Sequence, residues 1–371
     1  MRRFTVAIGG TSFGRSVQAV AFQRHPGFEL VALAGSDPGR TRRIADELGV
    51  AGAYTDWARM LHELEPALAS VASPVDLHHP MTMTALERGS HVLCEKPTAL
   101  NRFQAAEMRD RALELGRVGA VNHEFRFFPA RRHALDLVRR GAIGVPRRGE
   151  ILGRYALWPR PDSRAMTWLS ERARGGGILG ALGSHHTDCL RQFFGEPRRA
   201  LASVRVDQPR RGPTAEVAAE GQATADDACT VHYEFEGGAT GIVDLCAWAA
   251  YRWERFEVMG SEATLRWDET GYRLWRVVPK QSPEELEIPE EHRLWPREGD
   301  PALVAPFTVM VERLHRALSG EAPMEPHLGD AVAVQSALDA ARLSSAAGEW
   351  ISVDIPGSVP RPGRGAPEVQ P

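Results

Sequence analysis

The first 125 residues alternate short apolar runs with helical patterns, and this alternation limits the folds open to the chain. Apolar runs predict strands at 4–8, 28–35, 67–73, 91–95 and 117–125. Amphipathic periodicity predicts helices at 15–25, 38–49, 79–89 and 101–116. Strands that are apolar on both faces are typical of a parallel sheet covered by helices on each side. We therefore expect an α/β fold with an N-terminal, doubly wound Rossmann sheet.

After residue 125 the pattern changes to strand-like pieces joined by turns such as Glu236-Gly237-Gly238. This pattern predicts a second, α+β domain with a large, mainly antiparallel sheet. Helical patterns return at 307–319 and 330–346, and we expect them to pack back on the first domain. The end of the chain is rich in proline and glycine and lacks periodicity. The expected division is a domain over 1–122, a domain over 123–355 and a disordered tail over 356–371.

Composition narrows the class of function. The net charge of −3 gives no electrostatic reason to expect nucleic acid or an anionic membrane as a partner. The four cysteines show no CxxC pairing, so neither a disulfide framework nor a zinc site is indicated. The first residues run directly into an apolar strand, and no apolar run approaches the length of a membrane span. We expect a cytoplasmic protein with a small-molecule ligand.

A glycine turn, Gly10-Thr11-Ser12-Phe13-Gly14-Arg15, follows the first predicted strand. The dinucleotide fingerprint places G-x-G-x-x-G at such a junction, so that bare backbone approaches a pyrophosphate at a helix N-terminus. Here Gly10 is retained, Ser12 and Arg15 replace the other glycines, and Gly14 comes one place early. The strand before and the helix after favour nucleotide binding over a simple turn. The expected cofactor contacts are Gly10, Thr11, Ser12, Phe13 and Gly14.

The end of the second strand, A-G-S-D-P-G-R over residues 34–40, indicates which nicotinamide cofactor binds. An acidic residue there would grip the ribose 2′-hydroxyl, and strand alignment puts Gly35 in that position. With Gly35 in this position, no carboxylate is present there to repel a 2′-phosphate. The side chains of Ser36 and Arg40 are suited to bind such a phosphate. We therefore expect NADP(H) to be favoured over NAD(H). Asp37 either reaches the ribose or caps the helix that begins at Pro38, and capping is the favoured interpretation.

Lys96 stands between Glu95 and Pro97, directly after a predicted strand, where ligands bind in open α/β sheets. Only two of the 45 basic residues are lysines, and the other is Lys280. Arginine cannot give up a proton in proteins, whereas a partly buried lysine can do so or can polarise an alcohol. The alternative is an ordinary lysine in a surface turn.

The segment GGGILGALGSHHTD, residues 175–188, contains the second candidate. On a helix His185 and Asp188 share a face, so that Asp188 orients His185 or lies beside it at a substrate. His-His-x-Asp also suggests a metal, but no second cluster has ligand spacing, and we expect no metal site. The alternative is a capped helix with a satisfied histidine.

Together these segments resemble the glucose–fructose oxidoreductase and inositol dehydrogenase family, written Gfo/Idh/MocA, over residues 4–353. The resemblance rests on G-T-S-F-G, A-S-P-x-x-x-H (72–78), C-E-K-P (94–97), H-E-F-R-F (123–127), G-G-G…G-S-H-H-T-D and the closing segment 330–348. It implies a Rossmann domain, a C-terminal open sheet, a nicotinamide cofactor and hydride exchange with a sugar or cyclitol hydroxyl. It also implies a homodimer or homotetramer built through the face of the C-terminal sheet.

Carried over residue by residue, the resemblance makes Lys96 the catalytic lysine and His185 the catalytic histidine. It places Ser73, Pro74 and His78 in the loop beside the cofactor, and Glu95 at the nicotinamide end.

This chain departs from the family at two positions. The family often has an aspartate four residues before the histidine, where this chain has Ala181. Glu124 stands where the family usually has asparagine, and its carboxylate either compensates or pairs with Arg126. We expect Glu124, Arg126 and Trp168 to form the substrate wall, with a core or interface role as the alternative for Trp168.

These observations predict an NAD(P)-dependent oxidoreductase that acts on a sugar, cyclitol or related polyol, or on its keto form. His185 would take the hydroxyl proton during oxidation, Lys96 would hydrogen-bond the same oxygen, and Asp188 would orient the histidine. Two alternatives stay open. One is elimination or glycoside cleavage assisted by transient oxidation with a retained cofactor, and the other is a non-catalytic sugar or dinucleotide sensor.

Overall fold

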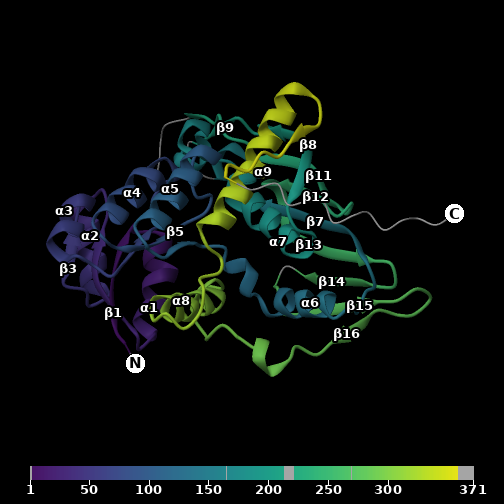
Figure 1. Cartoon of the computed structure of the whole chain (residues 1–371). Helices are drawn as coiled ribbons and strands as arrows, with labels where there is room; N and C mark the ends of the chain where they lie inside the picture. Colours follow the sequence, from purple (N-terminus) through teal and green to yellow (C-terminus); the bar gives the residue numbers. More distant parts are fainter. Residues whose placement is uncertain (1, 164, 213–220, 269, 358–371) are drawn as a thin grey trace.

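The computed structural model describes residues 2–163, 165–212, 221–268 and 270–357 (Figure 1). Its N-terminal region is a six-stranded parallel sheet in the order β3-β2-β1-β4-β5-β6. The strands are β1 (Phe4–Gly9), β2 (Phe28–Ala34), β3 (Gly52–Tyr54), β4 (Leu68–Val71), β5 (His91–Cys94) and β6 (Gly119–Val121). The strand order reverses between β1 and β4, and ligands of doubly wound sheets bind at the carboxyl ends of the strands beside such a point. The doubly wound parallel sheet is therefore confirmed.

Helices connect these strands. They are α1 (Val20–Arg24), which continues a π-helical turn over Gly14–Ala19, α2 (Pro38–Glu47), α3 (Trp57–Leu64), α4 (His78–Glu87) and α5 (Arg102–Glu114). Strand β3 and helix α3 were not predicted, because β3 has only three residues, all of them half-buried, and shows no apolar run. The strand expected over 117–125 ends at Val121, since the chain turns there into a 3-10 turn over Glu124–Phe127.

The second region is a nine-stranded sheet in the order β16-β15-β14-β13-β7-β12-β11-β8-β17. Only the β12–β7 pair among its pairings is parallel within the described chain. The predicted turn after residue 235 closes the β11–β12 hairpin, where Phe235 N donates to Ala239 O. The strands are β7 (Pro146–Ala156), β8 (Pro197–Arg205), β11 (Ala228–Phe235), β12 (Thr240–Cys246), β13 (Trp248–Gly260), β14 (Thr264–Asp268), β15 (Leu274–Val277), β16 (Glu284–Leu286) and β17 (Ile351–Ser352). A separate two-stranded sheet pairs β9 (Arg210–Arg211) with β10 (Gly221–Gln222).

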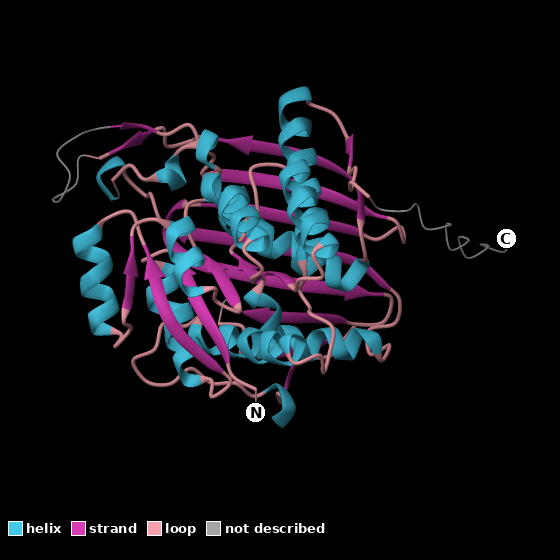
Figure 2. Cartoon of the chain, turned by 60° about the vertical axis from the view of Figure 1, so that its left-hand side comes forward, coloured by secondary structure: helices cyan, strands magenta, loops and turns pink. Residues whose placement is uncertain are grey.

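Helices cover one face of this large sheet, as Figure 2 shows. They are α6 (Pro129–Arg139), α7 (Ser184–Phe194) and α9 (Leu328–Ala347). On the other face, alternate residues of β7 and β12 remain half-exposed, which is the pattern of a sheet with one open side. The predicted large, mainly antiparallel open sheet is thus confirmed.

Helix α8 (Val304–Leu318) belongs to the core of the N-terminal region, although it comes from the end of the chain. In Figure 1 it lies beside α1, and its Phe307 ring meets Phe22 edge-on at 5.8 Å between ring centroids. Helix α9 contacts α5 and β6 of the first region as well as β8 of the second. The expectation that both closing helices pack back on the first domain is confirmed.

No helix in the described part of the chain is long and apolar enough to cross a membrane. The expected division at residue 122 stays a prediction. The expected disordered tail, 356–371, lies outside the described residues from 358 onward.

Candidate active site

Lys96 lies at the carboxyl edge of the parallel sheet, two residues after β5 ends at Cys94. The carboxylate of Glu95 is buried under it and accepts hydrogen bonds from Gln18 Nε2 at 2.9 Å and Asn122 Nδ2 at 2.6 Å. Burial raises the pKa of Glu95, with Lys96 as the largest opposing influence. Lys96 N also donates to Glu95 Oε2 at 3.3 Å, so the buried side chain holds the backbone at Lys96. The expected contact of Glu95 with the cofactor stays a prediction.

The ammonium of Lys96 reaches across to the second region, where Nζ donates to Ala181 O at 2.9 Å. Ala181 lies in a π-helical turn over Leu179–Gly183 that runs directly into α7. Asp226 caps the N-terminal end of this π-helical turn, because its Oδ2 accepts a hydrogen bond from Leu179 N at 2.7 Å. In the run of three glycines before this turn, Gly175 to Gly177, the third position requires glycine. At Gly177 φ is +111°, and a Cβ would lie 2.2 Å from Asp226 Oδ1. The glycines thus let Asp226 hold the start of α7 against Lys96.

His185 follows four residues after Ala181 and is buried in the first turn of α7. Its ring stacks on Phe125, with 3.7 Å between centroids and 5° between planes. Within the described residues neither ring nitrogen has a hydrogen-bond partner. Burial and then Lys96 hold the pKa of His185 well below its usual range. His185 is therefore a neutral imidazole at neutral pH, able to accept a proton.

Two more buried polar side chains stand beside His185. Glu124 Oε2 lies 3.9 Å from His185 Nε2, and the His123 ring lies 5.7 Å from the His185 ring between centroids. Neither the Glu124 oxygens nor the His123 nitrogens find a hydrogen-bond partner in the part of the chain that the structure describes. Burial lowers the pKa of His123 to about 4 and raises that of Glu124 to about 8. We call His123, Glu124 and His185 the open set.

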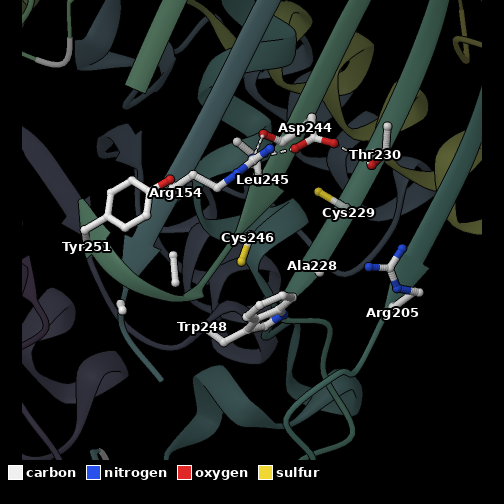
Figure 3. Close-up of a pocket in the computed structure, with 12 residues that line it drawn as sticks. Arg154, Arg205, Ala228, Cys229, Thr230, Asp244, Leu245, Cys246, Trp248 and Tyr251 are labelled. Atoms are coloured by element: carbon white, nitrogen blue, oxygen red, sulfur yellow. Dashed lines mark hydrogen bonds and ion pairs between the residues drawn. The ribbon is translucent and has the colours of Figure 1, made fainter. Parts of the chain in front are cut away.

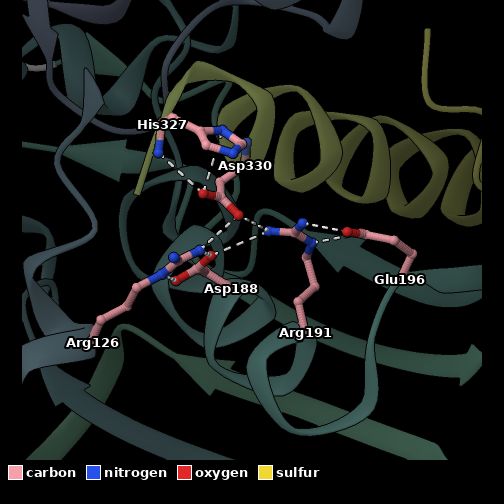
Figure 4. Close-up of polar contacts among 6 residues, drawn as sticks. All are labelled: Arg126, Asp188, Arg191, Glu196, His327 and Asp330. Atoms are coloured by element: carbon pink, nitrogen blue, oxygen red, sulfur yellow. Dashed lines mark hydrogen bonds and ion pairs between the residues drawn. The ribbon is translucent and has the colours of Figure 1, made fainter. Parts of the chain in front are cut away.

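The expected partnership of Asp188 with His185 is wrong, because the Asp188 carboxylate is taken by arginines (Figure 4). Asp188 Oδ2 accepts from Arg126 Nε at 2.6 Å, and Oδ1 pairs with Arg191 at 3.3 Å. Asp330 also binds the Arg126 guanidinium at 3.0 Å, and the expected place of Arg126 in the substrate wall stays a prediction. The alternative pairing of Arg126 with Glu124 is wrong too.

Figure 4 shows how these charges join three segments that lie far apart in the sequence. Arg126 follows β6, Asp188 and Arg191 lie on α7, and Asp330 begins α9. The pKa of Asp188 and that of Asp330 are lowered, because the pull of the arginines exceeds the penalty of burial. We call Arg126, Asp188, Arg191 and Asp330 the clamp. It fixes α7, and with it His185, against the end of β6.

The glycine turn after β1 fits a dinucleotide pyrophosphate. Gly10 has φ of +138°, and a Cβ there would lie 2.1 Å from Ala72 O, so only glycine is tolerated. Gly14 brings the helix close to β1, since a Cβ there would lie 2.8 Å from Ile8 Cγ2. Gly14 therefore performs the packing role of the third fingerprint glycine from one place earlier.

The Phe13 ring packs edge-on against Phe307 of α8, with 6.5 Å between centroids, and is partly buried against the core there. The expected contact of Phe13 with the cofactor stays a prediction.

The segment after β2 is close to the same turn. Arg40 Nη2 lies 3.4 Å from both Thr11 O and Ser12 Oγ, so its guanidinium lies over the glycine turn. Asp37 Oδ1 accepts from Arg40 N at 2.6 Å, which confirms that Asp37 caps α2. A side chain in place of Gly35 would meet Thr11 and Thr41 at 2.6 Å. Of the two side chains expected to bind a 2′-phosphate, Arg40 lies at this turn, and the contact of Ser36 stays a prediction.

His78 connects the two loops of the carboxyl edge. Its Nδ1 lies 2.9 Å from Pro97 O and its Nε2 lies 2.9 Å from Ser73 O. The buried ring thereby ties the Ser73–Pro74 loop to the residue after Lys96. Contacts of Ser73, Pro74 and His78 with a cofactor stay predictions.

Trp168 begins a 3-10 turn over Trp168–Ser170, ahead of the run of three glycines, and is half-buried. Its place in the substrate wall stays a prediction.

Gln18, Asn122 and His123 were missed by the sequence analysis. The position of Asn122 and His123 directly after β6 was the available signal, because the carboxyl ends of parallel strands share one edge. Among the described residues no group of three His, Cys, Asp or Glu side chains is arranged to hold a metal ion.

Comparison with protein families gives two matches. A family model described as an oxidoreductase family with an NAD-binding Rossmann fold matches residues 4–123. A second, described as the GFO/IDH/MocA C-terminal domain, matches residues 131–266. The two matches fall on the two sheets described above.

Individual proteins are similar as well. The D-glucoside 3-dehydrogenase of Escherichia coli is 32% identical over 202 residues, which cover 53% of this chain and 55% of that protein. The levoglucosan dehydrogenase of Pseudarthrobacter phenanthrenivorans is 25% identical over 297 residues, or 71% of this chain and 73% of that protein. The crystal structure of an oxidoreductase domain protein from Kribbella flavida superposes with a TM-score of 0.86 at 26% identity, covering 95% of this chain and all of the other.

Proposed function

The chain belongs to the GFO/IDH/MocA family of oxidoreductases, whose N-terminal domain is an NAD-binding Rossmann fold, and from this premise we propose that it oxidises or reduces a hydroxyl-bearing carbon of a sugar, cyclitol or related polyol. Two relatives are named as dehydrogenases, one of a D-glucoside and one of levoglucosan, and their names support this substrate class. A bound nicotinamide would supply hydride transfer to or from that carbon. The observation that carries the proposal is the approach of Lys96 to the start of α7, four residues before His185.

His185 acts as the base that takes the hydroxyl proton during oxidation. Its neutral ring, stacked on Phe125, offers an unshared nitrogen, and its low pKa keeps it unprotonated at neutral pH. Lys96 hydrogen-bonds the same substrate oxygen and stabilises the negative charge that develops there. To do so its ammonium exchanges or shares its bond with Ala181 O. Since the position of Ala181 carries no carboxylate, Lys96 and His185 perform the acid–base chemistry without an aspartate between them.

The glycine turn holds the cofactor, and NADP(H) is favoured over NAD(H). Gly10 leaves bare backbone for the pyrophosphate, while Ser36 and Arg40 receive a 2′-phosphate without a carboxylate at Gly35. The family is described as NAD-binding, and the test of the preference therefore has two arms. Fluorescence titration with NADPH and NADH should give the tighter Kd for NADPH. Arg40→Ala should weaken NADPH by about tenfold, the loss of one charge-assisted contact, and leave NADH unchanged. Tighter binding of NADH to the native protein would overturn the preference.

Turnover is tested with levoglucosan, methyl β-D-glucoside and myo-inositol, read at the absorbance of the reduced nicotinamide. Cofactor reduction with at least one of them is expected, and the absence of turnover despite tight cofactor binding contradicts the proposed reaction. Product formed without a net change in absorbance would instead indicate elimination or glycoside cleavage with a retained cofactor.

The open face of the large sheet joins copies of the chain into a homodimer or homotetramer. This face contains a pocket of about 570 Å³, lined by residues of β7, β8, β11, β12 and β13 (Figure 3). Exposed aromatic side chains, Trp248, Tyr251 and Trp253, stand at its rim or beside it. Light scattering should give a multiple of the chain mass, and Tyr251→Glu should lower it. The cytoplasmic location stays a prediction.

A further inference from the structure

Glu124 is a buried carboxyl group with an unusual lack of partners. Its side chain is fully buried at the start of the 3-10 turn that follows β6. Neither oxygen is hydrogen-bonded by any residue that the structure describes. A buried carboxylate without donors is costly, whereas an uncharged carboxylic acid is tolerated far better. The geometry therefore selects the acid form.

The groups that face Glu124 come from four places in the fold. The loop after β5 supplies Glu95 and Lys96, helix α7 supplies His185, and helix α6 supplies Arg131. His123 directly precedes Glu124 in the same segment, whereas Arg126 of that turn is held by Asp188. Burial and then Glu95 raise the pKa of Glu124 to about 8, while Lys96 and Arg131 oppose the rise. At neutral pH the carboxyl group is therefore mostly protonated.

The open set presents six polar atoms, two on each of its three side chains, without partners in the described chain. A neutral carboxylic acid donates one hydrogen bond and accepts others, and each neutral imidazole donates one and accepts one. A hydroxyl group likewise donates and accepts. Neighbouring hydroxyls of a polyol therefore match this surface, one at His185 and Lys96 and the next at Glu124.

We propose that Glu124 binds the substrate in its uncharged form and donates a hydrogen bond to a hydroxyl next to the reacting carbon. This inference rests on the proposed function and deepens it, because it names a donor that selects substrates with a second hydroxyl beside the first. A substrate that lacks this hydroxyl leaves the carboxylic acid buried and unpaired, and such a loss discriminates strongly. The bond is lost when Glu124 ionises, since a carboxylate only accepts.

Three variants separate the acid form from the ionised form. Glu124→Gln keeps a donor and an acceptor at the same place but cannot titrate. At pH 7 it should keep kcat/KM within about threefold, while Glu124→Ala should lower it by about 10- to 100-fold, the range for one buried hydrogen bond. Glu254→Gln removes another buried carboxyl group, on β13 outside the site, and serves as the matched control that leaves kcat/KM unchanged.

The pH profile gives the sharper test. Above pH 8 the KM of the native protein for levoglucosan or methyl β-D-glucoside should rise about tenfold per pH unit, because the acid form is depleted. In Glu124→Gln this rise should be absent. If Glu124→Gln loses as much kcat/KM as Glu124→Ala at pH 7, the ionised carboxylate is the working form and the inference is overturned. An identical alkaline rise of KM in Glu124→Gln overturns it as well.

A measurement without turnover keeps the inference separate from the proposed function. Infrared difference spectra between pH 6 and pH 9 should show loss of a carboxylic acid carbonyl band that Glu124→Gln lacks. Addition of levoglucosan at pH 7 should shift that band, and the shift should persist in Glu254→Gln. Turnover of a polyol with full activity in Glu124→Ala overturns only the role of Glu124. Failure of the native protein to bind any of the polyols overturns both the role and the proposed function.

Discussion

The clamp and the open set both take side chains from residues 123–126 and 185–188, and they differ in how their polar atoms are used. In the clamp, Asp188 and Asp330 share the guanidinium groups of Arg126 and Arg191. In the open set, all three side chains are as deeply buried, yet no described residue hydrogen-bonds them. Arg126 follows Glu124 by two positions, and Asp188 follows His185 by three.

This difference distinguishes residues that hold the fold from residues that meet a ligand. Paired buried charges are expensive to break but do no chemistry, because their protons and lone pairs are already committed. Unpaired buried groups reduce stability, and they stay available to a substrate. The partners of a buried carboxyl group therefore show whether it holds the fold or is available to a ligand. Asp188, which is paired with arginines, holds the fold, and Glu124, which lacks partners among the described residues, is available to a ligand.

The largest effect is expected from breaking the clamp. Asp188→Ala leaves Arg126 and Arg191 buried with too little negative charge, so the free energy of unfolding should fall by about 3–5 kcal/mol. Denaturant unfolding of this variant measures the loss, and Glu124→Gln, in the open set, is the comparison that should not be destabilised. A loss below about 1 kcal/mol would show that the clamp contributes little.

A smaller effect, on rate instead of stability, is expected at the open set. Lys96→Ala should lower kcat by about 10²-fold or more, the contribution of general acid–base catalysis, while the cofactor still binds. Lys96 donates one hydrogen bond to Ala181 O, so unfolding should change little. Lys280→Ala, at an exposed turn, is the matched control with unchanged kcat. Unchanged turnover in folded Lys96→Ala contradicts the assignment.

The two groups should also respond to pH in opposite directions. The pKa of Glu124 is raised from 4.5 to about 8, so its contribution to stability is complete below pH 4.5 and is lost as pH rises to 8. Asp188 and Asp330 have lowered pKa values, so the clamp is at full strength above pH 4 and weakens in acid. Between pH 5.5 and 7 the native protein should lose about 1.4 kcal/mol per pH unit relative to Glu124→Gln. Parallel unfolding curves across this window would rule out the raised pKa.

The smallest effect is expected at the edge of the clamp. Glu196 pairs with Arg191 at 2.7 Å, but its side chain is 39% exposed. Glu196→Ala should therefore cost at most about 1 kcal/mol, the value of an exposed ion pair. Arg191 stays paired with Asp188 and Asp330 in this variant. A loss as large as that of Asp188→Ala would extend the clamp to Glu196.

The sequence predicted the elements of the fold better than the partners of the site. Strong apolar runs marked five of the six parallel strands, whereas β3 lacked a run and was missed. The caps of α2 and the turn between β11 and β12 were predictable because they involve neighbouring residues. The partner of Arg126 is 62 residues away on α7, and no local pattern distinguishes Asp188 from Glu124 as that partner. Pairing between distant segments is decided by packing, and local spacing cannot predict it.

The position of α8 has a consequence for how the protein is made. Its Phe307 and Met310 complete the apolar core around β1 and α1, yet strands β7 to β16 lie between β6 and α8 in the sequence. At ribosomal rates of about 5–20 residues per second, roughly 200 residues require on the order of 10–40 s. During that interval the nascent N-terminal strands display the apolar surface that α8 will later cover. The N-terminal sheet, although it is synthesised before the second sheet, is therefore completed only after α8 has been made.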